Sequence, residues 1–436
     1  DQLTLIKTLS GSVVGTPATQ TAEVNIGSTL RYGFNVLTDS QRLYLNVHSI
    51  NDEEEESDTG DGGDTGDSGE GGDTGNGGDT GNGGDTGNGG DTGNGGDTGN
   101  GGDTGNGGDE TYTPPGQNNP VLPHSKAISE GAVAGLAFLT SAGDLAIDKG
   151  MQYARHAQTG KYGVAAFGVI EGGSSKYKTG SSVKVKGVSL LTGVTSNVEG
   201  IGLGGFLEWG NGNADTENPL STHTVKGDDE LHYYGLGVLM HWDHPEDHYY
   251  VNGTVRFGRV ENKFSTDDFL VAGAMQHAGY ELKTLYFGFQ AGVGYLWEIN
   301  DIGSLDVYGR FSWTRQNGDS VKLSTGESLK FSAINSERIK LGARYLWKAA
   351  TNITPYAGVA WQHDFGGKAD VTTNGEKIEA AALKGSSAVG ELGVTINTKS
   401  DENETQPGPW KFDFAVTGYA GKRQGVAGSA RVTYQW

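Results

Sequence analysis

The sequence predicts an all-β transmembrane barrel of 12 antiparallel strands, with an N-terminal α-helix running through its lumen. Three observations lead to this fold class. From residue 161 to residue 436, apolar and polar residues alternate with a period of two, in several runs of ten residues or more. A tilted strand of that length can cross a bilayer. Long and short connections alternate between the runs, and all 8 tryptophans lie near the ends of runs.

The charge of the chain is unevenly distributed. The 436 residues carry a formal net charge of -22, but residues 51–113 hold 18 Asp and Glu and no Lys or Arg. The rest is nearly neutral and has no basic stripe, so nucleic acid is not an expected partner. The absence of Cys excludes disulfides, thiol catalysis and thiolate metal sites. No apolar run reaches about 18 residues, so no transmembrane helix is expected.

The first region, residues 1–50, contains four short alternating runs with turn signals between them. Fifty residues of this kind cannot form a large core alone. We therefore expect the C-terminal remnant of a β-rich domain whose main body lies outside this chain. The start at Asp1, without Met or a signal peptide, indicates a processed product or a piece of a longer protein.

The second region, residues 51–117, is an acidic, Gly-rich, low-complexity segment that includes six DTGNGG units from residue 73 to residue 108. It has too little apolar surface to offset its ordering entropy, which predicts a disordered, extended linker. The DTG triplets also match the aspartic protease signature, but no apolar strand precedes them. Weak calcium association stays open as an alternative, because Gly and Asp recur at short period.

The third region, residues 118–160, contains a linker and a predicted lumenal α-helix over residues 124–158. Its surface is rich in Ala, Gly and Ser, which makes a slim rod. Gly131 and Gly135 lower its helix propensity, which indicates close approach of other backbone. Glu130, Asp144 and Asp148 are expected either to pair with lumenal Arg and Lys or to be solvated in a wet pore.

The fourth region, residues 161–436, is the predicted barrel. In the run 285–297 the odd-numbered residues are mostly large and apolar, and the even-numbered ones are polar or small. One face should therefore meet lipid and the other should line a wet lumen. The residues expected to line the lumen are Lys184, Lys186, Glu208, Arg256, Arg310, Arg344 and Arg431.

The connections and tryptophans give this barrel two rims. Residues 210–230, 261–279, 317–333 and 365–385 are predicted to be long loops on one rim, and most of the remaining connections are short turns on the other. Tryptophans favour the bilayer interface. The predicted interface girdle has Trp242, Trp297, Trp347, Trp410 and Trp436 at the short-turn rim, and Trp209, Trp313 and Trp361 at the long-loop rim.

These features together resemble the translocator unit of bacterial autotransporters, the type V secretion family. The terminal VTYQW, with Val432, Tyr434 and Trp436 on one face, is similar to the outer-membrane assembly signal of that family. The resemblance implies a monomeric barrel in outer-membrane lipid, inserted by the barrel-assembly machinery. It also implies that the N-terminal passenger is exported through or beside the barrel and displayed at the cell surface. An adhesin is the commonest passenger.

The resemblance also raises the question of self-cleavage, which some members perform at an Asn–Asn pair within the lumenal helix. Here the pair Asn118 and Asn119 precedes the predicted helix, so we expect the passenger to stay attached. In HWDHPEDH, three histidines (His241, His244 and His248) could ligate zinc or nickel. Their place in a predicted short turn favours plain surface exposure.

We therefore expect a non-enzymatic translocator and anchor with no catalytic residue, no metal and no cofactor. Two alternatives remain open from the sequence. One is a general outer-membrane pore with a disordered N-terminal extension. The other is an outer-membrane barrel hydrolase, whose dispersed catalytic residues would have no readable spacing.

Overall fold

The computed structural model describes residues 2–7, 21–38, 42–49, 120–150, 163–244, 247–299, 302–350, 352–399 and 407–436. The predicted linker 51–117 and the pair Asn118 and Asn119 lie outside the described residues. Four antiparallel strands form an N-terminal sheet in the order β1-β4-β3-β2. Their bounds are β1 (Gln2–Lys7), β2 (Thr21–Ile26), β3 (Leu30–Thr38) and β4 (Arg42–Ser49).

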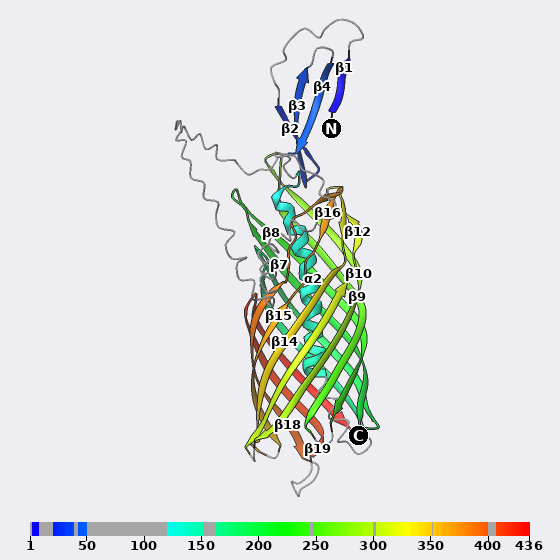
Figure 1. The fold of residues 1–436 in the computed structure, drawn as a ribbon, viewed down its shortest axis with the longest axis vertical. Coiled ribbons are helices and arrows are strands. Elements are labelled where there is room, and N and C mark those ends of the chain that lie inside the picture. The colour runs from blue at the N-terminus through cyan, green and yellow to red at the C-terminus, as the bar shows by residue number, and fades with distance from the viewer. Residues whose placement is uncertain are drawn as a thin grey trace, which may run out of the picture.

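The C-terminal part of the chain forms a closed barrel of twelve antiparallel strands, which confirms the predicted fold class (Figure 1). Chain neighbours pair throughout, and the last strand closes the barrel by pairing with the first. The strands are β5 (Val164–Lys178), β6 (Ser182–Val198), β7 (Ile201–Pro219), β8 (Thr224–Asp243), β9 (Tyr249–Val271), β10 (Ala274–Ile299), β11 (Gly303–Gln316), β14 (Ile334–Trp347), β15 (Ile353–Asp364), β18 (Gly385–Lys399), β19 (Pro407–Gly421) and β20 (Arg423–Gln435).

The expected long loops prove to be largely strand. Residues 210–230 continue β7 and β8, which stay paired up to Pro219 and Thr224. Residues 261–279 likewise continue β9 and β10 up to Val271 and Ala274. The other two connections carry a small sheet of β12 (Asp319–Lys322), β13 (Ser328–Phe331), β16 (Val371–Thr373) and β17 (Glu376–Lys377). We call this end of the barrel the hairpin end and the opposite one the short-turn end.

The strands continue toward the hairpin end because polar and apolar residues keep alternating there. Near that end, however, the outward residues are polar and the inward ones are apolar. In β8, Tyr234 and Leu236 face outward and are exposed. Closer to the hairpin end, the outward residues are charged, as at Asp228, while Leu231 and Val225 face inward and are fully buried. The outer wall is therefore apolar over one band and polar above it. The inner wall has apolar side chains where it packs against the helix.

One helical segment fills the barrel interior (Figure 1). It consists of a 3-10 turn, η4 (Pro123–Ser125), then α2 (Lys126–Asp144) and a π-helical turn, η5 (Leu145–Gly150). Pro123 suits a first turn because its missing N–H has no helical partner there. By length and composition the helix could cross a membrane, which was not expected from the sequence. However, 94% of its apolar 18-residue stretch is buried inside the barrel. It therefore faces protein rather than lipid.

Candidate functional site: the filled lumen and its mouth

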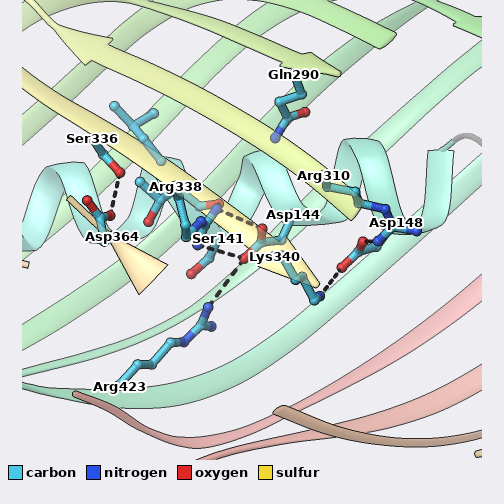
Figure 2. A network of polar contacts seen from close by, with 12 residues as sticks. Ser141, Asp144, Asp148, Gln290, Arg310, Ser336, Arg338, Lys340, Asp364 and Arg423 are labelled. Carbon is cyan, nitrogen blue, oxygen red and sulfur yellow. Dashed lines mark hydrogen bonds and ion pairs between the residues drawn. The ribbon is translucent and has the colours of Figure 1, made fainter. Parts of the chain in front are cut away.

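The C-terminal half of the helix is fixed by two aspartates that meet basic side chains of the barrel wall (Figure 2). Asp144 accepts two hydrogen bonds from Arg338 of β14, at 2.7 and 3.1 Å. Its Oδ2 also lies 3.4 Å from Nη1 of Arg423 of β20. One turn later, Asp148 pairs with Lys340 Nζ at 2.7 Å and with Arg310 of β11. Two carboxylates thus link three strands to the helix.

The burial of these pairs determines their strength. The side chains of Arg338, Arg423 and Arg310 are at most 7% exposed. Several cations in a buried space repel one another, and the helix carboxylates offset that repulsion. Removing one partner from a buried pair costs about 3–5 kcal/mol, because it leaves an uncompensated charge. The aspartates therefore hold the helix in place.

A second set of polar contacts fixes the middle of the helix. Arg256 is fully buried, its Nη1 lies 2.8 Å from Glu208 Oε2, and its Nη2 donates to the carbonyl oxygen of Leu139. Tyr286 donates to the other oxygen of Glu208 at 2.5 Å. An arginine from the wall therefore binds the helix backbone, and Glu208 neutralises its charge.

Two other expected lumen residues pair within the wall. Arg344 donates to Glu391 at 2.6 and 3.0 Å, and Arg431 forms an ion pair with Asp413. A cavity of about 270 Å³ lies beside Asp148 and is lined in part by Arg310 and Arg344. The lumen is therefore filled along α2, with an open space near the short-turn end.

Small residues let the helix and the wall approach closely. A Cβ placed on Gly131 would lie 2.7 Å from the Tyr280 hydroxyl, and one on Gly135 would lie 3.3 Å from Asn262 Nδ2. These neighbours are wall side chains, whereas the sequence led us to expect backbone. In return, Phe138 of the helix lies against Gly187 of the wall, where a Cβ would come within 2.7 Å of its ring.

Two residues expected in the lumen lie elsewhere. Lys184 and Lys186 are on the outer surface of β6, and Lys186 pairs with Asp215 at 2.7 Å. Their neighbours Val183 and Val185 face inward and are buried. The polarity inversion near the hairpin end explains this correction, since above the apolar band it is the outer face that is polar.

Two acids are buried at the hairpin half of the lumen. Glu130 accepts hydrogen bonds from Ser181 and, at 3.5 Å, from Thr179 through one oxygen. The other oxygen of Glu130 and both oxygens of Asp229 have no hydrogen-bond partner among the described residues. Neither acid belongs to the ion pairs that fix the C-terminal half of the helix.

The mouth of the barrel is covered by a turn of the N-terminal sheet, residues 27–30. The Ser28 hydroxyl donates to Glu327 at 2.8 Å, and the hydroxyls of Thr29 and Thr373 are 2.8 Å apart. At the start of the helix, His124 Nε2 donates to the carbonyl oxygen of Ser28 at 2.6 Å. Backbone hydrogen bonds from Arg31 to Pro120 and from Leu122 to Thr29, each 2.8 Å, extend this contact.

The expected girdle tryptophans all lie on the outer wall. Trp209, Trp297, Trp347, Trp361, Trp410 and Trp436 are exposed, and Trp242 and Trp313 are half-buried. Trp209 departs from the expectation that these residues lie at strand ends, because β7 continues for ten residues beyond it to Pro219. Tyr434 contacts Trp410 and Trp436 at ring-centroid distances of 4.7 and 5.1 Å, and Val432 faces outward beside them.

The three histidines of the HWDHPEDH stretch are not gathered around a point. His241 is buried and its Nε2 lies 2.9 Å from Asp243, while His244 stacks on Tyr249 at a ring-centroid distance of 4.5 Å. His248 is exposed. Among the described residues, no group of three or more His, Asp or Glu side chains is arranged to hold a metal ion.

Sequence reasoning missed several residues of the site. Arg423 has a readable signal, because counting back from Arg431 in steps of two along β20 places it on the lumenal face. Glu327 was missed because its role depends on Ser28, which is 299 positions away.

Fold and site define a class: a closed, twelve-stranded membrane barrel whose own N-terminal helix fills the lumen. The autotransporter beta-domain family model matches residues 166–402, more than half of the chain, so the chain belongs to this family. Barrels of this family are outer-membrane transport domains, which places the described barrel in that membrane. No curated protein matches the chain.

Solved autotransporter structures are similar to this chain. The translocator domain of autotransporter NalP from Neisseria meningitidis is 15% identical, with a TM-score of 0.54, and the match covers 72% of this chain and 100% of that one. The transport unit of autotransporter AIDA-I from Escherichia coli is 16% identical, with a TM-score of 0.49, over 62% of this chain and 90% of that one.

Proposed function

We propose that this barrel mediates the export of its own N-terminal passenger and anchors it at the cell surface. One observation carries the proposal: a single chain docks an N-terminal sheet on the hairpin end, continues from Pro120 into the lumen as a helix, and then forms the wall. The chain thus enters its own pore from the end that would face outward. This arrangement suits a translocator that stays attached to its exported passenger.

The filled lumen argues against the alternative of a general pore. The helix is buried along its length, and Asp144 and Asp148 hold it by ion pairs with four basic side chains. Small solutes would have no continuous path along α2. Nothing in the described part of the chain favours a barrel hydrolase, and we propose a non-enzymatic translocator.

The remaining parts have supporting roles in this proposal. The acidic repeats of residues 51–117 would act as a spacer that does not fold during passage and is repelled by anionic lipid surfaces. The outward face of Val432, Tyr434 and Trp436 would be read by the barrel-assembly machinery. Closure of β20 on β5 leaves the described barrel wall without a free edge, which suits a monomeric barrel in outer-membrane lipid.

Surface display tests the proposal. An epitope tag is inserted between residues 8 and 20, and the chain is expressed behind a signal peptide in a Gram-negative host. We expect antibody to label intact cells, and added protease to remove the tag while the barrel core is retained. A tag that is protected until the outer membrane is broken would place the sheet in the periplasm and refute the proposal. Binding of tagged cells to host cells then tests adhesion as the cargo activity.

A further inference from the structure

Four lysines lie close together on the outer wall of β5 and β6, between the apolar band and the hairpin end. Lys176 and Lys184 are direct cross-strand partners, and both are exposed. Lys178 is exposed two residues further along β5, and its backbone N–H donates to the carbonyl oxygen of Lys422. We call Lys176, Lys178, Lys184 and Lys186 the seam lysines. Like charges directly opposite each other are destabilising, so an anion bound between Lys176 and Lys184 would stabilise this arrangement.

The wall compensates these lysines from the β7 side, through Asp215 and through Glu217, which is exposed and lies opposite Ser182. Among the described residues the seam lysines form one ion pair, Lys186 with Asp215. Asp215 also lies opposite Lys184 in the strand register. On the other side, β20 places Gln424 opposite Lys176 and Val426 opposite Ser174. Elsewhere at this height the lysines meet acids, as Lys283 meets Glu281 at 2.8 Å. The seam lysines therefore form a locally cationic surface.

An apolar groove lies directly below the seam lysines on the same outer wall. It has a volume of about 480 Å³ and is lined by Ile170, Val188, Phe414 and Val416, among others. Gly172 and Gly428 are cross-strand partners within it and leave the wall hollow. From Gly172 to Lys176 the chain rises by about 13 Å along the strand, at about 3.3 Å per residue. The groove is thus within the apolar band, and the lysines are near its edge.

We propose that the groove and the seam lysines form a binding site for a phosphorylated, multiply acylated lipid of the leaflet at the hairpin end. An acyl chain would lie along the hollow at Gly172, and the headgroup phosphates would sit between Lys176 and Lys184. Lysine stems cover apolar surface while their charged ends reach the interface. Charge complementarity selects an anionic headgroup. The leaflet assignment rests on the proposed function, whereas the chemistry of the site does not.

The test is lipid binding by the purified full chain in a zwitterionic detergent. Lipid A, the diphosphorylated and multiply acylated glycolipid, is the probe, and native mass spectrometry measures the bound fraction. The seam variant is Lys176→Gln, Lys178→Gln and Lys184→Gln together. The matched control is Lys263→Gln with Lys283→Gln, which removes exposed lysines that have acidic partners. We expect the seam variant to bind at least about tenfold more weakly and the control to bind as the parent does.

Two further arms identify the ligand. Dephosphorylated lipid A should bind the parent as weakly as lipid A binds the seam variant, and Gly172→Leu should lower lipid A binding by filling the groove. Inorganic phosphate at millimolar concentration should not compete. Equal loss in the control pair, or full competition by inorganic phosphate, would overturn the proposal. Because this assay needs no cells, its failure would leave the display result untouched, and a failed display experiment would not affect it.

Discussion

At the scale of single residues, Asp229 is the side chain whose burial most evidently lowers the stability of the fold. It is 1% exposed, and neither carboxylate oxygen has a hydrogen-bond partner among the described residues. Asp229→Asn should raise the free energy of unfolding by about 1–3 kcal/mol, because burying a neutral amide without a partner costs less than burying a carboxylate without one. Thermal unfolding in detergent measures this change. Asp228→Asn is the control, since Asp228 faces outward and is exposed. A gain of equal size in both variants would contradict the interpretation.

Lys184 shows where residue-level prediction from the sequence ends. Alternation correctly indicates that Lys184 and Val183 face opposite sides of the wall. It does not indicate which side is the lumen, because a lipid-facing wall and a helix-facing wall are both apolar. The height of the residue along the strand decides, and that height depends on where the apolar band ends. Arg256 and Arg310 lie inside the band, and for them the assumed sides hold.

At the scale of elements, the helix is held through Asp144. Asp144→Ala should lower the unfolding free energy by about 3–5 kcal/mol, because Arg338 and Arg423 would stay buried without their partner. The loosened helix should also raise ion conductance in planar bilayers. Thermal unfolding and single-channel recording measure the two effects. Asp267→Ala is the control, since Asp267 is 85% exposed. Adding Arg338→Met to Asp144→Ala should recover part of the loss, and no recovery would argue against the pair.

The contact of the helix with the wall depends on shape as well as charge. A Cβ at Gly187 would lie 2.7 Å from the ring of Phe138 and 2.9 Å from the carbonyl oxygen of Asn211. Gly187→Ala should therefore destabilise the folded barrel by about 1–3 kcal/mol, the usual cost of overpacking. The matched control is Gly390→Ala, where a Cβ meets no atom within 4 Å. Thermal midpoints of the two variants in the same detergent compare them, and equal midpoints would contradict the role given to Phe138.

At the scale of the whole molecule, the sequence predicts the closed barrel, the number of strands and the presence of the lumenal helix. Period-two alternation and the Ala-rich composition of the helix are local signals, and they are strong enough to predict the strands and the helix. The extended hairpins at residues 210–230 and 261–279 were predicted to be loops, because their outer faces are polar and rich in Asn and Asp. The turn at Ser28 could not be predicted to meet Glu327, because the contact joins distant parts of the chain. Contacts of this kind follow only from the assembled fold.

That contact makes docking of the N-terminal sheet dependent on pH. Burial would raise the pKa of Glu327, but hydrogen bonds from Thr325 and Ser28 outweigh it and hold the pKa below its usual value of 4.5. A carboxylate whose pKa is lowered by docking stabilises the docked state above pH 4.5. That contribution is lost as the pH falls through the lowered pKa. We therefore expect the turn at residues 27–30 to detach in acid.

Cysteine labelling measures this detachment, since the chain has no native Cys. With Thr29→Cys introduced, thiol labelling by a reagent whose rate is calibrated on a model peptide at each pH should be slow at pH 7 and faster below about pH 4. Adding Glu327→Gln should give fast labelling at both pH values, because an amide cannot accept the same set of bonds and does not titrate. Glu376→Gln, an exposed acid of the neighbouring β17, should keep the pH dependence. Labelling of the Glu327→Gln chain that still slows at pH 7 would show that another group controls the docking.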